Sequence, residues 1–571
     1  MEHHAVPIGR VNRDAVVEVV LSRLGARRSS WNAADIRGEV EWIIATVDVV
    51  APAPVRHELV EDLGDHAVAR CVPLLARDDV PEHVRSITSR DVLDVEADLL
   101  ARLAARAEQP ATRARVGDVV AGRRLDHAQG QVVAALGATG QLLVIEGAAG
   151  AGKTTTLAAA HELLEMQDAR MMVVTPTLKA ARVAEEQLGA AAFTSAWLVH
   201  QHGFRWDQDG YWSRNPVPRE ALSAQARLLP GDLLLVDEAG MLDQDVALAL
   251  LTIADEAKAR IAFVGDRHQL PAVGRGGVLD HAARWARPEA CLELETVHRF
   301  TDPEYADLTL LMRTGQRPGE VFDRLHARGL IQIHPTEVER LAALTDVDGT
   351  LIADTREQVA TLNAAIRDQR LATGETSGTG VVTTAAGERL GIGDQIATRR
   401  NHRDLGVANR DRWTVTGTDD HGGLLVRGRC GSRSLPADYV RQHVELAYAT
   451  TVHGAQGEPV DQAHLLIGEA TGAAAAYVGM TRGRNHNTAH LVAESIDEAR
   501  AQWVDVFSRD RADLGPSHAA QTAAEDIERY GPQTRPRGSE LDVHTRYLGP
   551  RRPPNPSRPR PPRRPSADDE K

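Results

Sequence analysis

The middle of the chain carries its hydrophobic residues in short, unbroken runs that are separated by stretches with helical spacing. Each run has the length of one strand, and such runs are typical of strands buried on both faces of a parallel sheet. Four of them follow one another: QLLVIE (141–146), MMVVT (171–175), DLLLVDE (232–238) and IAFVGD (261–266). Helical spacing at 155–164 and 179–188 completes strand–helix units, which predicts an α/β fold with a doubly wound sheet.

A second set of apolar runs predicts a second parallel sheet further along the chain. These runs are TLIAD (350–354), AHLLIG (463–468) and AHLVAE (489–494). Between them, residues 376–441 are rich in Gly, Thr and Val and contain the turn sequence GTDDHGG, which predicts a small β insertion. The first hundred or so residues read as helical, and TSRD at 88–91 resembles a capping box.

These patterns divide the chain into six parts. We expect a helical N-terminal domain (1–118), a first α/β domain with a hairpin insertion near 200–215 (119–300), a linker and the start of a second α/β domain (301–375), the β insertion (376–441), the remainder of the second domain (442–505), and a helical extension with a disordered Arg/Pro-rich tail (506–571). Residues 550–565 include no acidic residue, so this tail either stays solvated or contacts nucleic acid.

Charge and cysteine content narrow the class of protein. The chain has 66 Lys and Arg against 80 Asp and Glu, which argues against a generally basic nucleic-acid coat protein but leaves room for a local basic groove. Its three cysteines include no CxxC pair, which excludes a four-cysteine zinc site and fits a reducing cytoplasm. No run approaches the roughly eighteen apolar residues that a membrane span requires. We therefore expect a cytoplasmic protein that does not bind membranes.

A glycine-rich segment after the first apolar run predicts nucleotide binding. GAAGAGKT (147–154) matches the GxxxxGK[ST] phosphate loop and stands between a predicted strand and a predicted helix, the context that this loop requires. Lys occurs at only four positions of the chain, so a chance match is rare. The motif predicts that Lys153 reaches the β and γ phosphates of ATP and that Thr154 coordinates Mg²⁺.

Two acidic residues end the third apolar run. Asp237 and Glu238 follow DLLLV, and ligands of open α/β sheets bind at the carboxyl ends of the strands. This position predicts that Asp237 holds Mg²⁺, directly or through water, and that Glu238 orients or deprotonates the attacking water.

Further segments resemble, in order, the motifs of superfamily 1 helicases of the RecD/TraI branch, and in particular the helicase part of MobF-type conjugative relaxases. The matching segments are LDHAQ (125–129), TPTLKAA (175–181), FTSAW (193–197), DEAGM (237–241), GDRHQLP (265–271), VHRF (297–300), YATTVHGAQG (448–457) and YVGMTRGR (477–484). The resemblance covers about residues 120–495. It does not extend to the relaxases' nicking domain, because the preceding 120 residues contain no relaxase histidine triad or tyrosine pair.

The resemblance implies two RecA-like P-loop domains, with the β insertion as an SH3-like module, and a role for each matching residue. For ATP it implies an adenine contact by Gln129 and a phosphate cradle from Gly147, Ala148, Ala149, Gly150, Ala151, Gly152, Lys153, Thr154 and Thr155. The catalytic residues would be Lys153, Glu238, Gln269 and the two arginine fingers Arg299 and Arg482, with Thr154 and Asp237 at the metal. The DNA-binding residues would be Pro176, Thr177, Lys179, Thr194, Trp197, Thr451, His453 and Gln456.

Aromatic residues cluster where a hairpin is predicted. Phe204, Trp206, Tyr211 and Trp212 flank the turn DQDG at 207–210. In related helicases a hairpin in this region serves as a strand-separating pin, and its rings could also stack on bases. The alternative is that the rings pack the hairpin onto its own domain.

These residues together predict an ATP-dependent DNA helicase or translocase. It would move on single-stranded DNA, act at duplex junctions, and serve conjugative DNA transfer or DNA repair and recombination; the 5′-to-3′ direction comes from the resemblance alone. One alternative is an ATPase that loads or remodels a separately encoded relaxase. A second is a DNA-binding scaffold with little ATP turnover.

Overall fold

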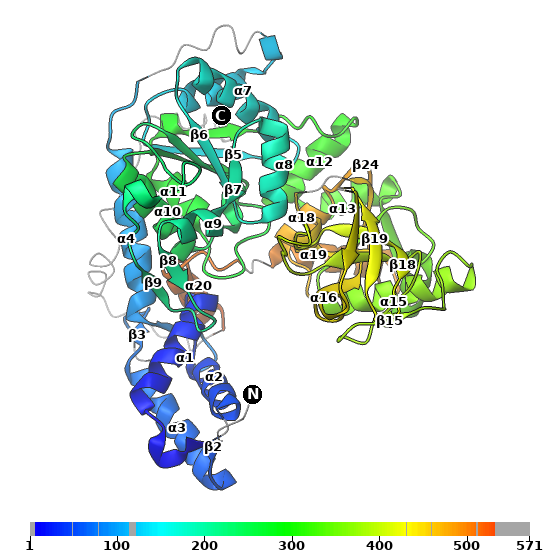
Figure 1. Cartoon of the computed structure of the whole chain (residues 1–571), viewed down its shortest axis with the longest axis horizontal. Helices are drawn as coiled ribbons and strands as arrows, with labels where there is room; N and C mark the ends of the chain where they lie inside the picture. Colours follow the sequence, from blue (N-terminus) through cyan, green and yellow to red (C-terminus); the bar gives the residue numbers. More distant parts are fainter. Residues whose placement is uncertain are drawn as a thin grey trace, which may run out of the picture.

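The computed structural model describes residues 6–47, 49–77, 79–112, 122–429, 431–457, 460–509 and 512–530. Three parts stand out in Figure 1: an N-terminal unit of helices (residues 13–69), a first α/β lobe (122–294) and a second lobe (303–509). The predicted Arg/Pro-rich tail lies outside the described residues.

The first lobe is a six-stranded parallel sheet covered on both faces. Its strands, in spatial order, are β12 (Cys291–Leu294), β5 (Leu142–Gly147), β11 (Arg260–Gly265), β10 (Leu233–Val236), β6 (Met171–Thr175) and β7 (Ala192–Thr194). Alternate residues of β5 face opposite ways. Leu143 and Ile145 pack with α6 (His127–Leu136), α7 (Lys153–Met166) and α8 (Leu178–Leu188). Leu142 and Val144 pack with α9 (Ser195–Gln201), α10 (Gln244–Ala257) and α11 (Val278–Trp285).

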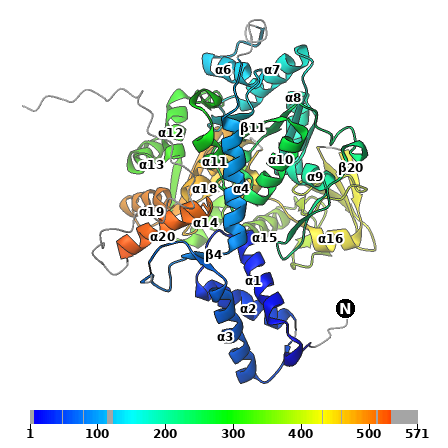
Figure 2. The ribbon, with the colours of Figure 1, turned by 90° about the vertical axis from the view of Figure 1, so that its left-hand side faces the viewer.

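The N-terminal unit has a core of its own and is joined to the first lobe by a long helix. Its helices α1 (Arg13–Arg27), α2 (Ala33–Thr46) and α3 (Ala53–Ala69) bury Trp31 completely. Helix α4 (Arg90–Ala107) runs from this unit along the first lobe (Figure 2), where Leu99 and Leu103 enter the core. Its N-cap is Ser89, whose hydroxyl accepts from the Val92 N–H. The expected cap therefore forms one residue later than Thr88, which ends strand β4 (Ile87–Thr88).

The second lobe repeats the layered arrangement with a five-stranded parallel sheet. In spatial order its strands are β13 (Ile331–His334), β24 (Gly483–Val492), β23 (Val460–Leu466), β14 (Thr350–Ala353) and β22 (Ala449–Thr451). Helices α12 (Pro303–Thr314), α13 (Pro318–Ala327), α18 (Ala473–Gly479) and α19 (Ile496–Ser508) share one core. Helices α14 (Glu337–Leu344) and α15 (Arg356–Ala372) share the other. The predicted α/β class with parallel sheets is confirmed.

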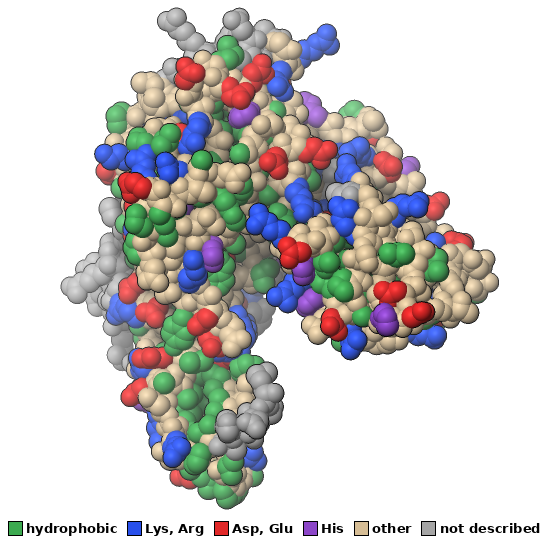
Figure 3. All heavy atoms as spheres, viewed as in Figure 1, with side chains coloured by type: hydrophobic (Ala, Val, Ile, Leu, Met, Phe, Trp, Pro, Cys, Tyr) green, Lys and Arg blue, Asp and Glu red, His purple; other side chains and the backbone are tan. Residues whose placement is uncertain are grey.

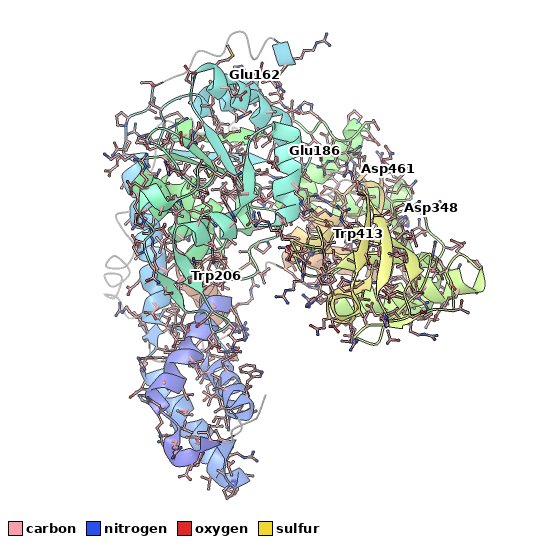
Figure 4. All side chains as sticks on the ribbon, viewed as in Figure 1. Glu162, Glu186, Trp206, Asp348, Trp413 and Asp461 are labelled. Atoms are coloured by element: carbon pink, nitrogen blue, oxygen red, sulfur yellow. The ribbon has the colours of Figure 1, made fainter. Side chains whose placement is uncertain are left out.

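A five-stranded antiparallel sheet projects from the second lobe (Figure 1). Its strands are β20 (Gly431–Leu435), β19 (Leu424–Gly428), β18 (Arg412–Thr418), β17 (Gln395–Thr398) and β21 (Val444–Leu446). The short hairpin β15 (Val382–Thr383) and β16 (Arg389–Leu390) precedes it, and α16 (Ala437–His443) precedes β21. The core of this sheet contains the indole of Trp413, which is labelled in Figure 4.

The described end of the chain returns from the second lobe to the first lobe and the N-terminal unit. Helix α20 (Pro516–Tyr530) contacts α4, and Ala523 and Ile527 pack on Val84. Just before it, the Asp513 carboxylate accepts from the Ser29 N–H and hydroxyl. The remaining short elements are β1 (Val6–Pro7), β2 (Val49–Val50), β3 (Val72–Pro73), α17 (Val452–Ala455) and the 3₁₀ turns at Ile8–Arg10, Arg219–Ala221, Ala239–Met241 and Pro288–Ala290. In the described ranges, every helix is too short or too polar to cross a membrane.

Candidate functional site

The predicted phosphate loop connects β5 to α7 at the carboxyl edge of the first sheet. Gly150 and Gly152 have φ values of 85° and 76°, a region that favours glycine. A Cβ on Gly150 would collide with the Cβ of Arg299, and one on Gly152 would lie 2.5 Å from Nε2 of Gln129. The loop therefore needs glycine for its backbone and for the close approach of Gln129 and Arg299.

Within this loop, Lys153 begins α7 and turns back over the loop backbone. Its Nζ donates to the Gly147 carbonyl oxygen at 2.6 Å. Thr154 and Thr155 are exposed in the first turn of α7, while Ala148, Ala149 and Ala151 are buried. An ammonium, a glycine-rich backbone and a helix N-terminus at one place are the features that bind phosphate.

The acidic pair follows β10, the strand two places from β5 in the sheet. Burial, reinforced by the neighbouring Glu238, raises the pKa of Asp237 to about 7, and Lys153 opposes the shift. Asp237 Oδ1 accepts from the Glu238 N–H at 2.9 Å, and Glu238 has a φ of 55°. A half-buried carboxyl whose surroundings discourage ionisation fits a divalent cation, because the cation would stabilise its charged form.

The donor set suits magnesium better than an all-protein metal cage. Over the described ranges, His, Cys, Asp and Glu side chains form no group of three or more that could hold an ion. Mg²⁺ usually takes one or two protein oxygens and fills its other positions with water and substrate phosphates. The Asp237 carboxylate and the Thr154 hydroxyl are oxygens of that kind.

Asp266, which the sequence analysis did not single out, joins the two lobes. The Tyr477 hydroxyl, on α18 of the second lobe, donates to Asp266 Oδ2 at 3.1 Å and accepts from the Ala149 N–H of the phosphate loop at 2.8 Å. Arg313 of α12 donates through Nε to Asp266 Oδ1 at 2.9 Å. Tyr477 and Asp266 lie in quoted motifs, but no local pattern marks Arg313, which lies in a helix outside them.

Gln456 brings a second bridge to the same place. Its Nε2 lies 3.4 Å from Glu238 Oε2 and 3.5 Å from Gln269 Oε1, at the long end of hydrogen-bond distance. Gln269 itself is buried and donates to Asp266 Oδ2 at 3.4 Å. A residue predicted to bind DNA thus contacts two residues predicted to act on ATP.

Of the two predicted arginine fingers, Arg299 lies against Gly150 of the phosphate loop, and Arg482 lies near Arg299. Arg299 donates through Nη1 to the Thr481 carbonyl oxygen at 2.8 Å, and Arg482 donates through Nε to the Val478 carbonyl oxygen at 3.0 Å. Burial lowers the pKa of Arg482 to about 10, and the charge of Arg299 adds to this effect. Burial likewise lowers the pKa of Arg299. An anion between the two guanidinium groups would relieve this cost.

At the other end of the site, Gln129 occupies the first turn of α6. It forms a capping box with Asp126, whose carboxylate also lies 3.3 Å from His298 Nε2. The side chain of Gln129 is buried next to Gly152. The structure thus places the predicted adenine contact at the phosphate loop.

Three predicted DNA-contacting threonines are helix N-caps. The hydroxyls of Thr177, Thr194 and Thr451 accept from the N–H three residues on, at 3.2, 3.0 and 3.1 Å. Each of them begins a helix, and Thr194 and Thr451 are also the last residues of β7 and β22. Their side-chain oxygens are therefore engaged by backbone, and Trp197 stacks on Phe193 with ring centroids 4.1 Å apart.

A basic cavity lies where α8, the second sheet and the antiparallel sheet meet. Thr451 and two acidic residues, Glu388 and Glu445, line it. Its basic lining residues are Lys179, Arg356, Arg399, Arg410, Arg412 and Arg482. Burial, together with the charge of Arg410, lowers the pKa of nearby His453. The surface view shows Lys and Arg side chains along the edges that face the hollow between the lobes (Figure 3). These arginines come from separate elements of an Arg-rich chain, so no local pattern in the sequence marks them.

The predicted hairpin is present as β8 (Phe204–Trp206) and β9 (Trp212–Arg214). Trp206 and Trp212 stack with ring centroids 4.8 Å apart, and the guanidinium of Arg214 lies over the ring of Phe204. Phe204 and Trp212 pack against the first lobe's core, whereas Trp206 and Tyr211 are about two-fifths exposed. Phe204 and Trp212 thus fit the predicted packing role, and Trp206 and Tyr211 are exposed enough to stack on bases.

Comparisons with known proteins find relatives for much of the chain. The family model of the AAA domain matches residues 124–336. The probable conjugal transfer protein TraA of Sinorhizobium fredii is 26% identical over 414 residues, which cover 70% of this chain and 35% of that protein. The RecBCD enzyme subunit RecD of Mycolicibacterium smegmatis is 28% identical over 362 residues, 57% of this chain and 63% of that protein. This chain is a homologue of TraA and RecD.

The solved structure of Bacteroides Pif1 bound to single-stranded DNA aligns with 66% of this chain and 96% of its own, at 18% identity and a TM-score of 0.44. The resemblance to the RecD/TraI branch is confirmed by the TraA and RecD matches. The chain spans about a third of the length of the TraA proteins that it matches.

Proposed function

We propose that this chain is an ATP-dependent DNA helicase or translocase that moves 5′ to 3′ on single-stranded DNA. One observation carries the proposal: Tyr477 of the second lobe contacts the phosphate loop of the first lobe, and Gln456 contacts Glu238 beside it. Arg299 lies against the same loop, with Arg482 close to Arg299. A nucleotide between these groups would change the contacts that join the lobes. Its hydrolysis would then move one lobe against the other.

Each residue around the nucleotide has a role that its position supports. Gln129 would contact the adenine, the loop N–H groups and Lys153 would hold the phosphates, and Mg²⁺, held by Thr154 and Asp237, would supply positive charge at the phosphates. Glu238 would orient the attacking water, with Gln269 beside it. Arg299 and Arg482 would neutralise charge that develops in the transition state, and buried guanidinium groups do so without reorganising.

The single-stranded DNA would cross the carboxyl ends of the strands in both parallel sheets. The N-terminus of α8 at Thr177 offers N–H groups to phosphates, and the basic cavity, lined by Thr451, offers guanidinium groups. Gln456 would report strand binding to the hydrolytic residues, since it contacts Glu238 and Gln269. The negative net charge of the chain leaves these positive sites as the local route for DNA.

The relatives favour a role in conjugative transfer or in DNA repair, since they are conjugal transfer proteins and a RecBCD subunit. The proposed place of action is the cytoplasm. A relaxase is a further partner in this proposal, since the matched TraA proteins are conjugal transfer proteins.

The test is ATP hydrolysis by the purified chain with and without single-stranded DNA, with Glu238→Gln as the control. The helicase proposal expects strong stimulation that the Glu238→Gln chain loses, followed by unwinding of a duplex with a 5′ tail. Hydrolysis without stimulation would favour an ATPase that acts on a relaxase. ATP binding without turnover would favour a scaffold.

A further inference from the structure

The tip of the hairpin, residues 207–210, is docked on the N-terminal unit. Arg23 of α1 donates through Nη1 to Asp209 Oδ1 at 2.9 Å. A Cβ on Gly210 would lie 2.6 Å from the Cβ of Ala26 and 3.0 Å from the Ser22 carbonyl oxygen, and Gly210 has a φ of 83°. Figure 4 shows Trp206 on the hairpin next to the end of α1. The sequence separation is large, so no local pattern predicts this contact.

Arg23 is fixed from several sides. Besides Asp209, its guanidinium pairs with Glu39 of α2 and lies over the ring of Trp42 at 3.9 Å. The Arg23 side chain is 7% exposed. The Arg23 guanidinium has little access to water, so losing its contact with the hairpin costs free energy. This distinguishes the pair from an exposed salt bridge.

The hairpin turn holds its own shape, so docking sets only where the turn lies. Asp207 Oδ1 accepts from the Asp209 N–H at 2.9 Å and from the Tyr211 N–H at 3.1 Å. The stacked indoles of Trp206 and Trp212 stiffen the two strands. Because these contacts are internal, they do not fix the direction of the hairpin relative to the sheet ends.

A cavity lies where the hairpin, α1 and the first lobe meet. Arg23, Arg27 and Trp206 line it from α1 and the hairpin, and Pro176 and Ser195 line it from the first lobe, together with the acidic Asp243 and Asp245. Pro176 and Ser195 follow β6 and β7, the strand ends at which we place the DNA strand. The Ser195 hydroxyl is buried and has no hydrogen-bond partner among the described residues. A strand leaving these loops would therefore meet the hairpin and α1 next.

We propose that the N-terminal unit is a brace that holds the hairpin as a fixed wedge at the junction of duplex and single strands. Arg23 and Asp209 are the positioning residues of this brace. The proposal rests on the helicase function proposed above. The wedge is thus made by two parts of the chain, and α1 belongs to it as much as the hairpin does.

The experiment compares the full chain with its Asp209→Ala variant. Asp209 is 29% exposed, but its partner Arg23 is buried, so removing the carboxylate should lower the docked fraction by about tenfold. Backbone hydrogen exchange of residues 204–214 should then rise, and the unwinding rate of a forked duplex should fall by about fivefold or more, while ATPase stimulated by single-stranded DNA stays within about twofold. Asp209→Glu, which keeps the carboxylate, should restore most of the unwinding.

The matched control is Asp62→Ala, which removes an exposed ion pair with Arg13 in the same unit and should change neither exchange at the hairpin nor unwinding. Unchanged unwinding by Asp209→Ala, whether or not exchange rises, would overturn the brace. An equal loss of ATPase and unwinding would overturn it as well, because the pair would then support the fold only. If the unmodified chain shows no DNA-stimulated hydrolysis, the helicase proposal itself fails.

Discussion

Lys153 is the residue on which nucleotide hydrolysis should depend most directly. Its ammonium donates to the Gly147 carbonyl oxygen of the phosphate loop. Because the lysine side chain is flexible, the ammonium could turn from this carbonyl to a bound phosphate. We expect Lys153→Ala to lower ATP turnover by about a hundredfold or more, the cost of losing one preorganised donor, while the urea unfolding midpoint stays unchanged.

The matched control for this change is Lys258→Asn, which removes a lysine from the exposed C-cap of α10, where φ is 54° and Asn is well tolerated. It should leave turnover unchanged. Turnover retained by Lys153→Ala would remove the loop from its proposed role.

His490 gives the second lobe a pH-dependent stability. It lies between His334 and His464, with ring nitrogens 3.1 and 3.0 Å away, and His464 also contacts the Asp348 carbonyl oxygen. Burial lowers the pKa of His490 to about 3, and its two neighbours and Arg340 act in the same direction. Other charged or titratable groups around these three histidines are Glu337, Glu339 and His486.

The sign of the effect follows from this lowered pKa. Below pH 6.5, His490 is protonated in the unfolded chain but stays neutral in the folded protein. Its contribution to the free energy of unfolding should therefore fall by about 1.4 kcal/mol per pH unit as the pH drops toward 4. Urea unfolding of the full chain at several pH values measures this slope. His490→Gln should flatten it, whereas the exposed His57→Gln should not; equal slopes in both variants would contradict the assignment.

At the scale of elements, the helix caps at the ends of strands connect stability with DNA contact. Thr194 ends β7 and caps α9, so its hydroxyl is engaged by the Trp197 N–H. Thr194→Val should cost about 1 kcal/mol of stability through the lost cap and weaken binding of single-stranded DNA, because α9 begins at the proposed strand path. Thr194→Ser keeps the cap and should restore both. Urea unfolding and fluorescence anisotropy of labelled DNA test both variants. If the Thr194→Ser chain folds but does not bind DNA, the threonine methyl group and not the cap makes the DNA contact.

The helices and strands are the part of the structure that the sequence predicted best. The apolar runs at 171–175 and 232–238 contain β6 and β10, and those at 141–146 and 261–266 contain most of β5 and β11, because a strand buried on both faces must be apolar throughout. The helical character of the first hundred residues is equally local. That α4 contributes Leu99 and Leu103 to the core of the first lobe could not be read from the sequence, since an amphipathic pattern does not name the surface that covers it.

At the scale of the whole molecule, the site consists of contacts between residues hundreds of positions apart. The phosphate loop and the acidic pair were predictable because each is a short motif with fixed spacing. The bonds of Tyr477 to Ala149 and Asp266, and of Arg313 to Asp266, depend on how two lobes pack. The same is true of the hairpin on α1 and of the arginines in the basic cavity. Motifs thus identify the chemistry, whereas packing decides which groups share it.

Tyr477 is the contact through which the second lobe should sense the phosphate loop. Its hydroxyl bonds both Ala149 and Asp266, so Tyr477→Phe removes two bonds between lobes and leaves the ring in place. A hydrogen bond to a charged group contributes about 1.5–3 kcal/mol, so stimulation of ATPase by single-stranded DNA should fall by about tenfold or more. The control is Tyr305→Phe, which removes a buried hydroxyl that donates to the Met480 carbonyl oxygen within the second lobe. Steady-state ATPase over a DNA titration separates the two variants, and an equal loss in both would show that buried hydroxyls support folding here and not communication between the lobes.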